Sequence, residues 1–251
     1  MFRASRGFRS RNPLISRMPY GAATGTGAQA RYSTFLFKLT ILVGVMVAFG
    51  ALAMGSIMEA GEIFGGVVLL IAAPIVAFIS VIVAMRSVRW APYFGLLYAV
   101  MQGLFLGTIS GLYELIAGDG IVATALLGTA GVFVAMLILF RSGIIRVTET
   151  FRKVMFMALL GIIFSSLFLF VLSLFGLFGE LAFGFYFVII IVSVIVASLY
   201  LVIDFDNIQT LIDSGADQRY EWMYALSLLV TVVWLYVELL RLLLILSQRR
   251  R

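Results

Sequence analysis

The sequence predicts an all-α, polytopic membrane protein with about seven transmembrane helices. Hydrophobic residues make up 63% of the 251 residues and charged residues only 12%. The mean hydropathy is +1.14, so the chain has too few polar side chains to cover a water-soluble surface. Several uninterrupted apolar runs approach or exceed the ~20 residues that a helix needs to cross a bilayer. Helices are the expected spanning element, because lipid offers backbone groups no hydrogen-bond partners.

Seven apolar runs define the expected spans, which together form one domain. Residues 1–33 contain six arginines and no acidic residue, and we expect them to be a flexible basic tail on the cytoplasmic side. Residues 34–247 form the expected seven-helix transmembrane domain, and residues 248–251 a basic C-terminal tail. The sixth span is expected to extend to residue 212. In chain order, the expected spans are 34–57, 64–84, 93–116, 121–140, 154–178, 181–203 and one within 222–247.

The third span carries Gly103, Gly107 and Gly111 at intervals of four residues. This spacing places three small residues on one face of the helix, where a neighbouring backbone can approach closely. Tight helix packing is the favoured interpretation, and a pore-lining role is the alternative.

The charges of the connections predict the orientation. The connections at 85–92 and 141–153 are basic, whereas those at 58–63, 117–120 and 179–180 carry only acidic charges. By the positive-inside rule, the basic connections and the N-terminus face the cytoplasm. Seven spans then place the three terminal arginines outside, and the alternative is a last segment that re-enters and returns. A bacterial plasma membrane is expected, and the arginine-rich start leaves a mitochondrial inner membrane as the other possibility.

The composition also excludes several classes of function. Cysteine and histidine are absent, which removes disulfides, thiolate chemistry and the usual ligands of zinc, copper and haem. The only lysines, Lys38 and Lys153, lie near span ends, whereas a retinal protein needs a lysine within a span to form its Schiff base. We therefore expect no enzyme and no cofactor. The net charge of +6 is explained by orientation in the bilayer and predicts no nucleic-acid partner.

Charged residues within spans are the candidates for function, because burying an ionised group in a bilayer costs at least ~2.5 kcal/mol. Asp204 and Asp206 lie in the sixth span, and Glu238 and Arg241 lie in the seventh. Glu238 has two readings. It can pair with Arg241 on the same helix face, or it can share a proton with Asp204 across the two helices. The second arrangement would be a pH sensor that needs no histidine.

The depth of the two acids limits that pairing. At 1.5 Å per residue, Glu238 would lie ~25 Å deep if the seventh helix crossed the membrane from Glu221 onward. The acids meet only if residues 219–227 first lie along the membrane interface, and we predict that arrangement; otherwise Glu221 becomes the partner of Asp204. Glu114, near the outer end of the third span, is either an interface charge or an acid of an outer vestibule.

Two stretches, LYLVIDFDNIQ and WLYVELLRLL, resemble the Bax inhibitor-1 family, also called the transmembrane Bax-inhibitor-motif family. The resemblance implies a seven-helix bundle with a central last helix that acts as a pH-sensitive calcium leak. Asp204 occupies the place of the family's acid in helix six. Glu238 in LYVE matches the second acid, which the family carries in a Leu-Tyr-Leu-Asp-like stretch. Arg86 matches by position an arginine that latches onto the acid pair.

The expected function is therefore a Ca²⁺ leak channel or transporter that is gated by protonation of Asp204 and Glu238. The same two acids would also be the ligands of the passing ion. Arg86 would be the latch. Asp206, Arg241, Glu221 and Glu114 are possible accessory residues. Carboxylates suit a hard, oxygen-seeking cation, but calcium itself is implied by the resemblance alone. The alternatives are a proton-coupled cation exchanger and a membrane regulator of protease, cell-death or stress control that binds other membrane proteins without transport. The expected partners are the lipid bilayer, Ca²⁺, H⁺ and possibly other membrane proteins.

Overall fold

The computed structural model describes residues 28–60, 66–118, 120–176 and 179–248. Most of the predicted tail at 1–33, the acidic residue at 62 and the three terminal arginines therefore lie outside the described residues. Over the described ranges, every regular element is a helix, apart from one isolated bridge between Gln29 and Asp217. The elements are α2 (Tyr32–Ala60), α3 (Gly66–Arg86), α4 (Ala91–Ala117), α5 (Ile121–Arg141), α6 (Glu149–Leu174), α7 (Glu180–Asp213), η1 (Gln218–Tyr220) and α8 (Glu221–Gln248).

The seven α-helices correspond one to one with the seven predicted spans. Six of them, all except α3, are long and apolar enough to cross a membrane. The described part of α3 is a shorter apolar helix, Leu70–Arg86. The predicted extension of the sixth span is confirmed, since α7 runs without interruption to Asp213.

Helix α6 begins five residues earlier than the predicted span. The Thr148 side chain accepts a hydrogen bond from the backbone N–H of Phe151, and this cap starts the helix at Glu149. Arg152, predicted as a charge of the connection, therefore lies in the first turn of α6. Its side chain is held against α7 rather than in solvent.

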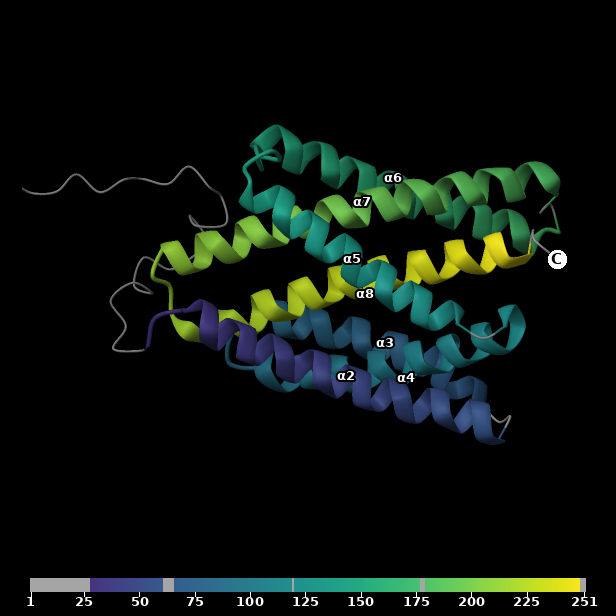
Figure 1. The fold of residues 1–251 in the computed structure, drawn as a ribbon, viewed down its shortest axis with the longest axis horizontal. Coiled ribbons are helices and arrows are strands. Elements are labelled where there is room, and N and C mark those ends of the chain that lie inside the picture. The colour runs from purple at the N-terminus through teal and green to yellow at the C-terminus, as the bar shows by residue number, and fades with distance from the viewer. Residues whose placement is uncertain (1–27, 61–65, 119, 177–178, 249–251) are drawn as a thin grey trace, which may run out of the picture.

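The helices fall into two groups on either side of α5 and α8 (Figure 1). Helices α2, α3 and α4 pack together on one side, and α6 and α7 pack together on the other. Helix α8 contacts α2, α3, α4, α5 and α7, so it packs against both groups.

Glycines bring α2 and α4 into backbone contact, as the spacing in the third span predicts. A Cβ atom at Gly103 would collide with the carbonyl oxygen of Met46, and one at Gly107 with that of Gly50. A Cβ at Gly111 would lie 3.3 Å from the side chain of Ile57. The three glycines thus form one packing face, and the prediction of tight helix packing is confirmed.

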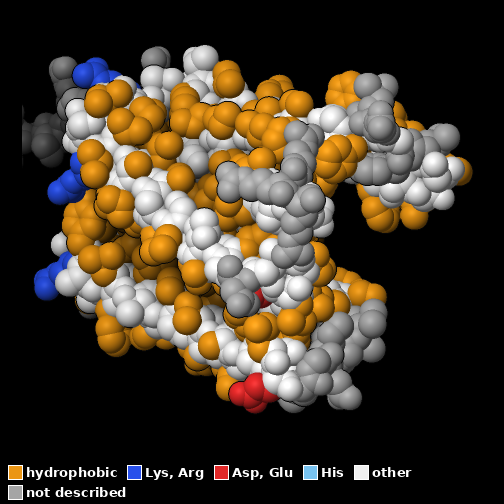
Figure 2. All heavy atoms as spheres, turned by 45° about the vertical axis from the view of Figure 1, so that its right-hand side comes forward, with side chains coloured by type: hydrophobic (Ala, Val, Ile, Leu, Met, Phe, Trp, Pro, Cys, Tyr) orange, Lys and Arg blue, Asp and Glu red, His pale blue; other side chains and the backbone are white. Residues whose placement is uncertain are grey.

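The helix ends and the connections between them lie at two opposite ends of the bundle. The N-terminus of α2 and the connections at 87–90, 142–148 and 214–220 lie at one end, called the basic end here. The connections that follow α2, α4 and α6 lie at the other, called the acidic end. Figure 2 shows lysine and arginine side chains along one edge of the molecule and a small acidic patch away from that edge.

The prediction that residues 219–227 lie along the membrane interface is wrong. Helix α8 begins at Glu221 and continues unbroken past Leu228, so residues 221–227 form its first two turns. The chain turns directly into the helix because Asp217 accepts a hydrogen bond from the N–H of Arg219 and so begins the short 3-10 turn η1. The buried carboxylate of Glu221, described below, then holds the first turn of α8 against α2.

Candidate functional site

Asp204 is buried in the contact between α7 and α8. Its carboxylate accepts hydrogen bonds from Ser227 Oγ at 3.0 Å and from Thr231 Oγ1 at 2.6 Å. Ser227 and Thr231 are four residues apart, so both hydroxyls project from one face of α8. Only 6% of the Asp204 surface is exposed, which makes these two hydroxyls the main substitute for water around a buried acid. The three residues therefore act as a latch between the two helices, called the Asp204 latch.

A second polar group lies beside the latch, between α6 and α7. Arg152 forms an ion pair with the carboxylate of Asp206 and donates a hydrogen bond from Nη1 to Asn207 Oδ1 at 2.9 Å. About a fifth of the Arg152 side chain and a third of the Asp206 side chain remain exposed (21% and 32%), so this pair is only partly shielded from solvent. Asp204 and Asp206 thus contact different helices, although only one residue lies between them in sequence.

Glu238 lies near the acidic end of α8 and has its own neighbours. Trp234 Nε1 is 3.3 Å from Glu238 Oε1 and 3.1 Å from Ser193 Oγ, and Arg241 Nη1 is 3.5 Å from Glu238 Oε2. The Glu238 side chain is only 9% exposed. Among the described residues, its Oε2 atom has no hydrogen-bond partner. The ion pair with Arg241 on the same helix agrees with the first of the two sequence readings.

The structure does not bring Asp204 and Glu238 together, and the predicted contact between their carboxyl groups is corrected here. Thr231, which binds Asp204, precedes Glu238 by seven residues, or ~10 Å along a helix. On α7, Ser193 at the level of Glu238 precedes Asp204 by eleven residues, or ~16 Å. The two acids therefore lie at different levels of the bundle. The position opposite Asp204 is filled by Thr231.

Arg86 is the last residue of α3 and is exposed at the basic end. Within the described ranges it forms no hydrogen bond or ion pair with Asp204, Asp206 or Glu238. The arginine that does reach an acid of α7 is Arg152. The structure thus offers Arg152, rather than Arg86, as the cation beside this site.

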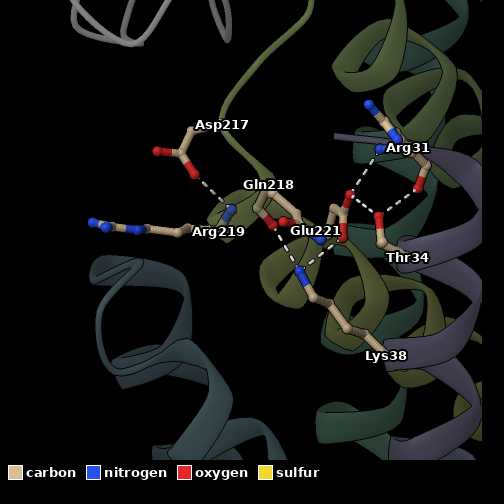
Figure 3. A network of polar contacts seen from close by, with 7 residues as sticks. All are labelled: Arg31, Thr34, Lys38, Asp217, Gln218, Arg219 and Glu221. Atoms are coloured by element: carbon tan, nitrogen blue, oxygen red, sulfur yellow. Dashed lines mark hydrogen bonds and ion pairs between the residues drawn. The ribbon is translucent and has the colours of Figure 1, made fainter. Parts of the chain in front are cut away.

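Glu221 is completely buried and ties the first described helix to the last one (Figure 3). Its Oε1 atom accepts hydrogen bonds from the backbone N–H of Arg31 at 2.8 Å and from Thr34 Oγ1 at 2.7 Å. Its Oε2 atom lies 2.7 Å from Lys38 Nζ, which also donates to the Gln218 carbonyl at 2.8 Å. We call this network the Glu221 clamp. Its partners lie on α2 and the segment before it, so Glu221 is not the partner of Asp204.

The segment before α2 is also paired with the turn before α8. The N–H of Ala30 donates to the carbonyl of Ala216, and the N–H of Gln218 donates to the carbonyl of Ala28, both at 2.9 Å. Residues 28–31, predicted as part of the tail, thus pack against the α7–α8 connection.

Glu114 has a structural role at the acidic end. Its carboxylate accepts hydrogen bonds from the backbone N–H of Gly120 and from that of Val122, the latter at 2.9 Å. It therefore caps the N-terminus of α5, where an acidic group is favoured by the helix dipole. In the described part of the chain, no three acidic side chains gather closely enough to hold a metal ion.

The sequence analysis missed Ser227, Thr231 and Arg152. Serine and threonine within a helix commonly satisfy their hydroxyls on the preceding turn, so they carry no distinctive signal. The signal for Arg152 was the Thr148-Glu149 pair before an apolar run, which is typical of a helix start and places Arg152 inside the bundle.

A comparison with known protein families identifies the family of this chain. The model of a family described as Bax inhibitor 1 like matches residues 12–248, nearly the whole chain. A comparison with curated proteins finds no match. The family match includes α2 to α8 and the Asp204 latch. The chain therefore belongs to the Bax inhibitor-1-like family of membrane proteins.

Proposed function

We propose that this chain is a proton-sensitive cation leak, with Ca²⁺ as the passing ion, and that the Asp204 latch is its sensor. The observation that carries the proposal is a buried carboxylate held between two membrane helices by two hydroxyl donors. The choice of Ca²⁺ rests on the family resemblance and on the preference of this ion for carboxylate oxygens. In this arrangement the central helix of the pathway is α8, and the basic end faces the cytoplasm of a bacterial cell.

The latch responds to protonation because the two forms of a carboxyl group bond differently. The carboxylate of Asp204 accepts from Ser227 and Thr231 at the same time, and hydrogen bonds to an ionised acceptor are roughly twice as strong as neutral ones. A protonated carboxyl carries a donor on one oxygen, which faces a hydroxyl that was itself donating. Protonation therefore weakens the contact between α7 and α8. We propose that this loosening opens the leak, so flux rises as the pH falls.

The cluster formed by Arg152, Asp206 and Asn207 would then set the resting position of α7 from its other side. This cluster replaces the predicted latch at Arg86, because Arg152 is the arginine that contacts α7. Glu238 would act separately, as a single acid on the path near the acidic end. A cation passing between the two acids would meet carboxylate oxygens at two levels of the bundle rather than at one paired site.

The test is Ca²⁺ flux into liposomes that contain the purified protein, measured across about pH 5 to 8. Wild type is expected to leak more at low pH. Asp204→Asn, which mimics the protonated form, should leak strongly at every pH. Asp213→Asn is the matched control, because Asp213 is an exposed acid at the end of the same helix; it should keep the pH dependence of wild type.

Each other outcome points to a different function. Flux that appears only when a proton gradient is imposed would indicate a proton-coupled exchanger. Flux no greater than that of empty liposomes at any pH would reject transport and favour a regulator that binds other membrane proteins. A pH-dependent flux that Asp204→Asn leaves unchanged would keep the leak but reject the Asp204 latch as its sensor.

A further inference from the structure

An apolar crevice of about 470 Å³ lies between α2, α4, α5 and α8. Along α2 it extends from Leu39 to Met54, and along α8 from Leu228 to Tyr236. It does not include Asp204 or Glu238. The small residues Gly50, Ala51 and Ala130 are part of its lining and leave the space that larger side chains would fill.

The lining offers nothing to a polar ligand. Among the described residues that line it, none is charged, and the side-chain polar groups are the hydroxyls of Ser110, Thr129 and Tyr236. The Ser110 and Tyr236 hydroxyls lie 2.6 Å apart and bind each other, and Thr129 donates to the carbonyl of Ala125 at 2.7 Å. Water needs two to four polar partners to occupy a cavity, whereas apolar cavities bind apolar guests. The occupant must therefore be a hydrocarbon.

The crevice is continuous with the lipid-facing surface of the bundle. Val47 on α2 and Leu126 on α5 belong to its lining and are also 57% and 54% exposed. Both residues lie within helices that are long and apolar enough to span a membrane, not in the connections at either end. The mouth of the crevice consequently opens sideways toward lipid chains.

The length and direction of the crevice indicate which kind of hydrocarbon fits it. Leu39 and Met54 are fifteen positions apart, which corresponds to ~22 Å along a helix, most of the ~30 Å hydrocarbon core of a bilayer. This elongated space runs parallel to the helices, as a lipid chain does. We propose that the crevice binds one acyl chain of a membrane phospholipid, held more tightly than the lipids that surround the rest of the protein.

The first test maps lipid contacts on the wild-type protein in liposomes. The probe is a phospholipid that carries a photoactivatable diazirine in one acyl chain, and mass spectrometry locates the adducts after irradiation. Adducts should concentrate on crevice residues such as Met46 and Met54. The exposed residues Phe164 and Phe168 on α6, which lie outside the crevice, report ordinary lipid contact. Equal labelling of both regions would overturn the proposal.

The second test fills the crevice. Ala51→Phe and Ala130→Phe each place a ring in it, and Ala48→Phe and Ala123→Phe are matched controls on the same helices at exposed positions outside it. A ring takes up space that the acyl chain would fill, so labelling of the crevice residues in both filling variants should fall to the level of Phe164 and Phe168, while the controls label as wild type.

Retention of one phospholipid by the protein in detergent, measured by native mass spectrometry, gives an independent readout of the same variants. The bound lipid should be lost in both filling variants and kept in both controls. A filled variant that retains the lipid and its labelling, or a wild-type protein that retains none, would refute the site. Size-exclusion profiles that match wild type show which variants are folded, and the mapping on wild type decides the question even if a variant is not.

Discussion

The α2–α4 contact and the α7–α8 contact are made in opposite ways. Between α2 and α4, glycines let the two backbones touch, and no side chain could be added at Gly103 or Gly107 without a collision. Between α7 and α8, a buried carboxylate is held by two hydroxyls that can exchange donors and acceptors. The first contact depends on shape, which pH does not change. The second depends on the charge of Asp204, so only this one can respond to a proton.

The Glu221 clamp joins the two contacts, and breaking it should give the largest effect. Lys38→Met leaves the buried carboxylate of Glu221 without its cation, which should lower the free energy of unfolding by about 3 to 5 kcal/mol. The measurement is denaturant unfolding in detergent micelles. Lys153→Met removes an exposed charge from the same end of the bundle and should change little. Lys38→Met combined with Glu221→Leu should recover most of the loss, because an apolar pair can replace a buried ion pair.

The shape-dependent contact is tested by adding one methyl group. Gly107→Ala places a Cβ against the Gly50 carbonyl and should lower the free energy of unfolding by about 1 to 3 kcal/mol, the usual cost of overpacking. Gly44→Ala lies on α2 where no atom is within 4 Å of an added Cβ, so it is the control. Leak through the variant should keep its pH dependence. Loss of that dependence in Gly107→Ala would show that the two contacts are not separable.

The charge-dependent contact is tested by removing a donor without changing shape. Thr231→Val takes away the hydroxyl that lies 2.6 Å from Asp204 and should lower the free energy of unfolding by about 1 to 2 kcal/mol. It should also raise the Ca²⁺ leak at neutral pH, because the latch is weakened in both forms of the acid. A leak identical to wild type at every pH would contradict the role of α8 in the latch.

The smallest expected effect is a coupling energy near zero between Asp204 and Glu238. Asp204 and Glu238 have separate partners, so a double-mutant cycle of Asp204→Asn and Glu238→Gln should give a coupling energy below about 0.5 kcal/mol in unfolding. A coupling of several times that size would restore the paired-acid reading. The single variant Glu238→Gln keeps an acceptor for Trp234 and loses only the 3.5 Å ion pair with the partly exposed Arg241, so it should change stability by less than about 1 kcal/mol.

The helices were predictable because each one needs only a sufficiently long apolar run, and hydropathy measures that directly. The relative register of α7 and α8 was not, because sliding one helix by a single turn changes its neighbours by ~5 Å without altering either sequence. Glu238 therefore seemed a suitable partner for Asp204, while the structure places Thr231 there. Serine and threonine hydroxyls can also donate hydrogen bonds to a buried carboxylate, and in this site Ser227 and Thr231 do so.

The start of α6 shows a second limit. The predicted span began at residue 154 because hydropathy detects where apolar residues begin, whereas a helix begins where its cap is formed. Thr148 provides that cap, and the helix therefore includes Arg152. Five residues of difference were enough to move an arginine from a connection to an ion pair with Asp206.

The Glu221 clamp also sets the order in which the protein can be completed during synthesis. Lys38 and Glu221 are 183 residues apart in the chain, and domains are made from the N-terminus onward. While the ribosome produces the intervening helices, the ammonium group of Lys38 cannot yet meet the carboxylate of Glu221. The first and last described helices can be joined only when the chain is almost finished. A truncated product that ends before Glu221 would thus keep Lys38 without the carboxylate that it contacts in the longer chain.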